Sequence, residues 1–141
     1  MDAASRNVAA FLESLQDARR RLADVWNRAP WRGGEPCESF LLLGNAFMVD
    51  HGESVRQYHG EVTLGLRAKD AEDREFTCTV NVLWGAEGWT ITSQAWQGDR
   101  LLGELPERRA SALDQCLEQL RAAVEGVRSF DPLFAGEEAW A

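Results

Sequence analysis

The alternation of apolar and polar side chains is clearest between Phe76 and Trp96. Two arms of this stretch alternate with a period of two, which is typical of half-buried β-strands. The residues Gly85–Gly88 connect the arms, and glycine reaches the positive φ angles that tight hairpin loops require. The pattern therefore predicts a β-hairpin in which Trp84 pairs with Trp89.

The two faces of this hairpin differ in character. One face carries large apolar side chains and needs a core. The other face carries hydroxyl and amide side chains, namely Thr77, Thr79, Asn81, Thr90, Thr92 and Gln94. Trp96 falls on this second face, close to Thr77. We therefore expect this face either to be solvated or to contact a partner.

The segments before the hairpin follow similar patterns. Apolar residues recur at helical spacing over residues 3–28, which predicts an amphipathic helix. Residues 38–50 and 55–68 each predict a strand, with turn residues between them. The simplest closure of the turn before the hairpin pairs Leu66 with Phe76. In this register one apolar face is continuous over the second, third and fourth strands.

A second helix is expected after the hairpin. Pro106 is predicted to open it, because the fixed φ of proline suits the first helical turn. A stripe of apolar residues follows at helical spacing: Leu113, Leu117, Leu120, Val124 and Val127. The predicted fold is α+β, a two-layer sandwich made of an N-terminal helix, a four-stranded antiparallel meander and a C-terminal helix.

The first strand has an apolar side that needs a cover. If the alternation continues across Gly44, this side carries Phe40, Leu42, Ala46 and Met48. Two covers are consistent with the sequence. One is the C-terminal tail, through Phe130, Leu133 and Phe134, and the other is a second copy of the chain in a homodimer.

Length and composition indicate the broad class of protein. We expect the 141 residues to form one domain, 1–141, with residues 130–141 as a docking or flexible tail. The sequence has no apolar run of about eighteen residues and no pattern of a secretory signal. Its three cysteines are widely spaced and odd in number. These features favour a cytoplasmic protein without a disulfide framework.

The net charge of −8 bears on the choice of partner. A negative field repels nucleic acid and anionic membranes, and it speeds encounter with a basic protein. We therefore expect a protein partner, basic in character, and neither nucleic acid nor a membrane. Lys69 is the only lysine beside many arginines, a bias that is typical of a bacterial source.

Candidate chemistry is sparse in this sequence. His51 lies beside Asp50 and Glu53 in a turn, without the spacing that metal sites usually show. Cys37 lies in a loop, but the sequence places no histidine beside it to activate the thiol. Nucleophile elbows, phosphate-binding loops and dinucleotide fingerprints do not occur. We therefore expect no catalytic, metal-binding or cofactor-binding residues.

Two classes of function remain open. The favoured one is a non-enzymatic protein-interaction module, because the helix–sheet–helix order is similar to that of small bacterial immunity proteins and secretion chaperones. Its candidate partner surface is the polar hairpin face with two tryptophans: Thr77, Thr79, Asn81, Thr90, Thr92, Gln94, Trp96 and Trp140. The alternative is an enzyme or small-ligand binder with a pocket between sheet and helix, lined by Tyr58, Trp84 and Trp89.

Overall fold

The computed structural model describes residues 3–27, 38–44, 47–51, 54–69 and 72–134. The helical elements are α1 (Ala3–Asn27), α2 (Leu113–Gly126), the 3-10 helix η1 (Val127–Phe130) and α3 (Asp131–Phe134). The strands are β1 (Glu38–Gly44), β2 (Phe47–His51), β3 (Ser54–Lys69), β4 (Glu75–Gly85), β5 (Gly88–Gln97), β6 (Arg100–Glu104) and β7 (Arg108–Ala110).

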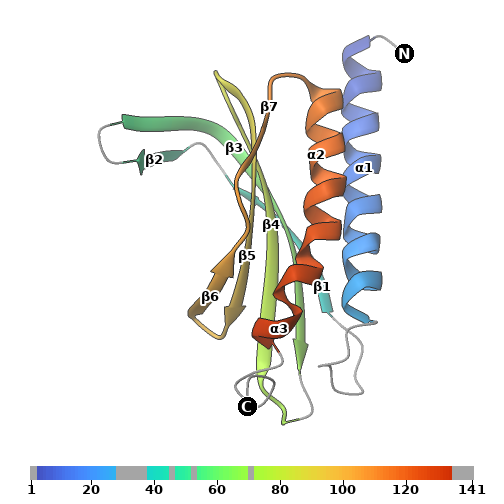
Figure 1. Cartoon of the computed structure of the whole chain (residues 1–141). Coiled ribbons are helices and arrows are strands. Elements are labelled where there is room, and N and C mark those ends of the chain that lie inside the picture. Colours follow the sequence, from blue (N-terminus) through green and yellow to red (C-terminus); the bar gives the residue numbers. More distant parts are fainter. Residues whose placement is uncertain (1–2, 28–37, 45–46, 52–53, 70–71, 135–141) are drawn as a thin grey trace.

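The described strands form one antiparallel sheet. Its order is β1–β3–β4–β5–β6, while β2 pairs with the first part of β3 and β7 pairs with the first part of β5. Figure 1 shows α1 and α2 side by side on one side of this sheet. Strands that follow each other in the chain are mostly neighbours in the sheet. The predicted α+β architecture, with its meander between two helices, is confirmed.

The sheet has more strands than the four that the sequence predicted. The predicted first strand is divided into β1 and β2, which pair with different halves of β3. Pro106 does not open a helix but lies between β6 and β7, and α2 begins at Leu113. The physical reason is that Arg108–Ala110 pairs with Trp89–Ile91, which satisfies backbone groups along the edge of β5.

The hairpin of β4 and β5 has the predicted register. Trp84 is opposite Trp89, and the pairing continues without a shift to Phe76 and Gln97. Gly88 has a φ of 111°, which an L side chain rarely adopts. This glycine is therefore the residue that allows the tight connection.

The predicted register between β3 and β4 was wrong by two residues. Leu66 is opposite Cys78 rather than Phe76, because the ladder begins where Lys69 pairs with Glu75. The connection therefore runs between Lys69 and Glu75, and it includes Asp73 at a φ of 65°. A shift of two residues keeps every side chain on the same face, so the predicted apolar face is still correct.

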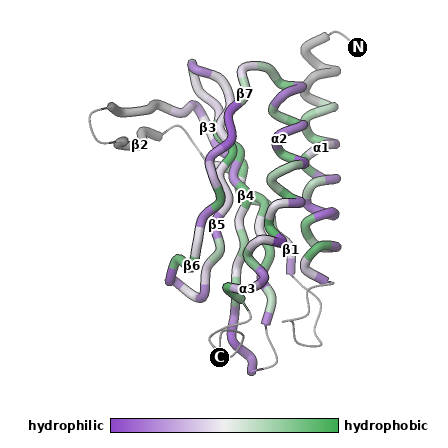
Figure 2. Tube along the Cα trace, in the orientation of Figure 1, coloured by the Kyte–Doolittle hydropathy of each residue, from purple (hydrophilic) through white to green (hydrophobic). Residues whose placement is uncertain are grey.

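The core lies between the apolar face of the sheet and the inner sides of α1 and α2. Its largest fully buried side chains include Trp26, Phe76, Phe134, Leu22, Leu64 and Leu66. Burial of each such side chain contributes about 1.5–3 kcal/mol before the loss of chain entropy is subtracted. In Figure 2, apolar and polar stretches alternate along both α1 and α2.

The segment after α2 belongs to this core. Phe134 packs against Trp26 and Phe76, with ring centroids 5.0 and 5.3 Å apart, and Phe130 is also buried. Leu133 approaches Gly103 on the same side of the sheet. Residues 130–134 therefore do not cover the outer side of the first strand, and that predicted cover was wrong. Residues 135–141, Trp140 among them, lie outside the described residues.

Candidate functional site

The sheet face that turns away from the helices, here called the open face, carries a series of hydrogen-bonded polar side chains. We call them the polar ladder: Thr63, Thr79, Asn81, Thr92 and Gln94. Asn81 is central, since its Oδ1 accepts a hydrogen bond from the Thr63 hydroxyl at 2.8 Å. Its Nδ2 donates to Thr92 Oγ1 at 3.1 Å and to Gln94 Oε1 at 2.6 Å. The Thr79 hydroxyl donates to the same Gln94 oxygen at 3.0 Å.

The register of the sheet brings the polar ladder together. Asn81 of β4 is directly opposite Thr63 of β3 and Thr92 of β5, and Thr79 is opposite Gln94. Opposite residues in an antiparallel pair point to the same face, with β-carbons about 4.5–5.5 Å apart. Thr63 is buried and the other four are half-buried. Each of these hydrogen bonds stabilises the fold by about 0.5–1.5 kcal/mol.

The polar ladder keeps hydrogen-bonding capacity for a partner. Gln94 uses its side-chain oxygen within the ladder, and among the described residues its Nε2 has no acceptor. The Thr92 hydroxyl accepts from Asn81, so its own proton is still available to a further acceptor. The ladder can therefore donate outward without losing its internal bonds.

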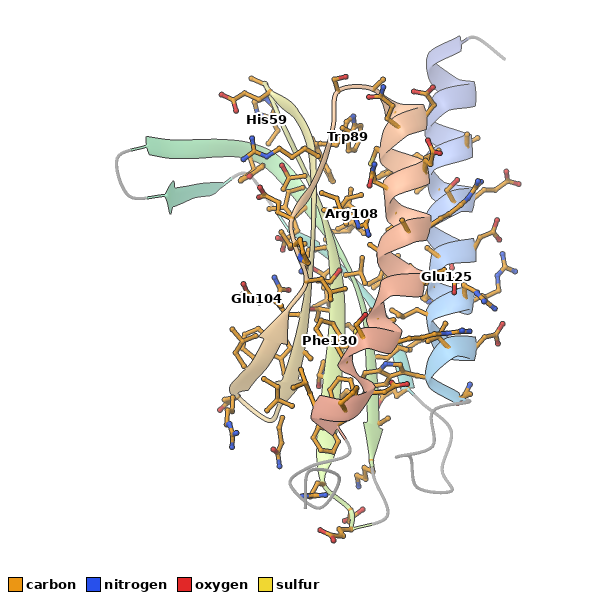
Figure 3. The ribbon with its side chains drawn as sticks, in the orientation of Figure 1. His59, Trp89, Glu104, Arg108, Glu125 and Phe130 are labelled. Carbon is orange, nitrogen blue, oxygen red and sulfur yellow. The ribbon has the colours of Figure 1, made fainter. Side chains whose placement is uncertain are left out.

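Two carboxylates lie beside the polar ladder on the open face. Glu61 of β3 places its Oε1 3.4 Å from Thr63 Oγ1, and Glu104 of β6 is opposite Gln94. Figure 3 shows Glu104 projecting from the side of the sheet away from α2. Within the described chain, neither carboxylate forms an ion pair with an arginine or lysine.

Two arginines of the open face, in contrast, have carboxylate partners. Arg67 lies 3.9 Å from Glu75 and its guanidinium is 5.1 Å from the ring centre of Phe40. Arg109 lies 3.1 Å from Glu107. Among the side chains that the structure describes, the charge left uncompensated on this face is therefore negative.

Trp96 lies at the end of the open face, where β5 pairs with β6. It is half-buried, opposite Thr77 on β4 and opposite Leu101 on β6, whose side chain is 43% exposed. These two residues add an apolar area to the polar ladder. Thr90, another predicted surface residue, is buried opposite Leu83.

The three residues of the predicted alternative pocket are not all brought together. Trp84 and Trp89 pack on each other at 6.0 Å and on Phe11 of α1 at 6.5 and 5.4 Å, so they form a half-buried aromatic cluster beneath the helix. Tyr58 is buried, but it is opposite Gly85, which follows Trp84. Its side chain is therefore directed to the open face.

A cavity of about 270 Å³ lies between α1 and α2. Its apolar floor includes Ala18, Leu120 and Val124, and charged side chains rim it. Two of the lining residues are hydrogen-bonded across the helices, since Arg21 of α1 donates from Nε to Glu125 Oε1 of α2 at 2.5 Å. This hydrogen bond lowers the pKa of Glu125 below its ordinary value.

The described thiols and histidine offer no recognisable catalytic group. Burial raises the pKa of Cys116 to about 11 and moves the pKa of Cys78 upward still further, so both stay protonated at neutral pH. In the described part of the chain, no group of three histidine, cysteine or acidic residues is placed to hold a metal. His59 is exposed at a register shift in β3. Cys37 and Glu53 lie outside the described residues.

The sequence pattern identified most of the polar ladder but not its borders. The alternation along β4 and β5 placed Thr79, Asn81, Thr92 and Gln94 on one face. Thr63 and Glu61 follow the same alternation on β3, and that signal was available. Glu104 was not identified, because β6 itself was not predicted.

Comparison with protein-family models, with curated proteins and with solved structures gave no match to this chain. Of the helices in the described ranges, none combines the length and apolar character that crossing a membrane requires.

Proposed function

We propose that this protein is a non-enzymatic protein-interaction module that binds a partner protein over the open face of its sheet. The observation that carries this proposal is the polar ladder, with outward donors on Gln94 and Thr92 and two carboxylates beside it. Trp96 and Leu101 add apolar contact area at one end, and tryptophan is enriched among residues that dominate binding energy.

The partner in this proposal is basic. Glu61 and Glu104 have no cationic partner among the described residues, whereas Arg67 and Arg109 are already paired. A positively charged surface that reaches both carboxylates would complement the open face, and the net charge of −8 would speed its approach. Cys78 and Cys116 as free thiols support a reducing compartment such as the cytoplasm for this encounter.

Affinity capture from an extract of the source cells tests the proposal. The wild-type chain is compared with Trp96→Ala, which removes the indole, and with Glu104→Gln, which removes a charge while keeping the side-chain shape. Glu118→Gln on the exposed outer side of α2 is the matched control. We expect a protein retained by the wild type and the control, and about tenfold weaker retention by Trp96→Ala, as for a tryptophan that is buried when a partner binds.

The same experiment contains the outcome that rejects the proposal. If no protein is retained at low or high salt, or if the open-face variants retain as much as Glu118→Gln, the open face is not the binding surface. Circular dichroism of Trp96→Ala separates loss of binding from loss of folding. An unfolded variant would mean that Trp96 belongs to the core.

A second candidate function is the binding of a small molecule. The cavity between α1 and α2 supports it through its apolar floor. Its volume of about 270 Å³ lies just under the roughly 300–1,000 Å³ of most ligand pockets, and it lacks convergent polar groups on that floor. The open face therefore has the stronger support.

A further inference from the structure

The outer edge of β1 bears the most exposed large apolar side chains among the described residues. β1 ends the sheet order, and Leu42 and Leu43 are 58% and 78% exposed. Leu42 is opposite Thr63 and so lies on the open face, while Leu43 is opposite Val62 and lies on the helix side. Leucines therefore project from both faces of a single sheet edge.

The opposite edge of the sheet has the features that usually prevent strands from pairing between molecules. β6 begins with Arg100 and ends with Glu104, and a register shift at Ala95–Trp96 interrupts its pairing with β5. Pro106 separates β6 from β7, which carries two arginines. Charges, proline and irregular pairing all discourage edge-to-edge association.

β1 has none of these features along its central part. It pairs with β3 without a register shift from Glu38 to Gly44. Between Ser39 and Gly44 it has no charged residue and no proline. An edge of this kind, with exposed leucines, favours the addition of another strand.

We propose that β1 pairs antiparallel with β1 of a second copy of this chain, so that a two-fold symmetric dimer forms with a sheet continuous across both subunits. A two-fold axis at Leu42 sets each Leu42 opposite the other and each Leu41 opposite a Leu43. Apolar side chains then meet apolar side chains on both faces of the new strand pair.

The properties of this edge fit a second copy of the chain. Identical antiparallel strands form reciprocal hydrogen bonds around a two-fold axis, so both copies satisfy the same backbone groups. The one charge in β1, Glu38, is at its end and opposite Arg67 of β3. Asp17 and Arg21 of α1 line the cavity with α2, and Leu12 lies on the opposite flank of α1. Leu12 is 55% exposed, so it adds apolar area to the side of the helix layer that faces away from α2.

The dimer would form through the outer backbone edge of β1, whereas the proposed partner surface is centred on β4, β5 and β6, so this inference does not depend on the proposed function. Sedimentation velocity over a concentration series measures the self-association of the full chain. We expect a wild-type dimer, and a dissociation constant raised by more than about tenfold in Leu42→Lys, because two ammonium groups then face each other across the axis. Leu101→Lys, a change at an exposed leucine of the other edge, is the matched control and should associate as the wild type.

Disulfide cross-linking provides a second readout with a folded variant. The background variant is Cys37→Ser, in which the two cysteines that remain, Cys78 and Cys116, are buried. Leu42→Cys is added to this background, so that it introduces an accessible thiol. Opposite strand residues are close enough for a disulfide, so oxidation should give a covalent dimer. Leu101→Cys in the same background should not. A wild-type chain that stays monomeric, or association that Leu42→Lys and Leu43→Lys leave unchanged, overturns the inference.

Discussion

At the scale of the residue, Gly65 allows the aromatic ring of Phe40 to lie on the open face. A β-carbon at position 65 would come within 2.0 Å of that ring. We expect Gly65→Ala to destabilise the protein by about 1–3 kcal/mol, because the ring must move from a well-packed position. Urea denaturation of the wild type and the variant measures this difference.

A double-mutant cycle supplies the control for this prediction. In a Phe40→Ala background the ring is absent, so the further change Gly65→Ala should cost much less than it does in the wild type. An equal cost in both backgrounds would show that the loss of stability comes from the backbone at position 65 and not from contact with Phe40.

The pairing of Phe40 with Gly65 shows what alternation along a single strand cannot predict. The pattern placed Phe40 away from the core, which is correct, and suggested that the tail or another copy covers it. The observed cover is partly local, since Arg67 of β3 lies over the ring. Such a contact depends on the register between two strands, and one strand's pattern does not contain that register.

At the scale of the element, the long helices and the central hairpin were predictable, whereas the short edge strands were not. α1 and the β4–β5 hairpin have strong periodicities within themselves. β7 has only three residues, Arg108–Ala110, and it is a strand because β5 offers it a backbone edge. Figure 3 shows Arg108 on the helix side of the sheet, where it donates to Gln119 of α2 at 3.0 Å. This role in joining layers comes from tertiary structure.

The contact between α1 and α2 includes a pH-sensitive ion pair. The Arg21 guanidinium lowers the pKa of Glu125 relative to its ordinary value of 4.5. A lowered pKa in the folded state stabilises that state above the unfolded-state pKa, and this stabilisation is lost as the pH falls through the folded-state value. We therefore expect Glu125→Gln to lower the urea midpoint near neutral pH and to have no effect in strong acid.

The size of this effect should be small, because both side chains are nearly half exposed to solvent. Exposed ion pairs are weakened by salt, so the difference in midpoint should also shrink at high ionic strength. Glu118→Gln on the same helix is the control, because it removes a carboxylate that forms no ion pair within the described chain. A midpoint difference for Glu125→Gln that is independent of both pH and salt would contradict the electrostatic explanation.

At the scale of the whole molecule, two surfaces with opposite character are available for association. The open face has a polar ladder and, within the described ranges, two carboxylates without a cationic partner, while the β1 edge is apolar and uncharged in its centre. They lie on one sheet, and the strand β3 contributes to both through Thr63 and through its pairing with β1. The sequence alone indicated a partner at the polar hairpin face and a second copy at the apolar side of the first strand, but it did not show that β1 forms an edge of the sheet.

The two surfaces should respond to salt in opposite directions. Raising the ionic strength from about 0.05 M to about 0.5 M shortens the Debye length from roughly 14 Å to roughly 4 Å. Attraction between the acidic open face and a basic partner is then screened, so capture should weaken. Two copies that each carry a net charge of −8 repel one another, and the same screening should strengthen the dimer. Sedimentation at both salt concentrations tests whether the dimer becomes stronger, and capture at both concentrations tests whether partner binding becomes weaker. A dimer that dissociates as salt is added would mean that charged groups, and not the leucines of β1, hold the copies together.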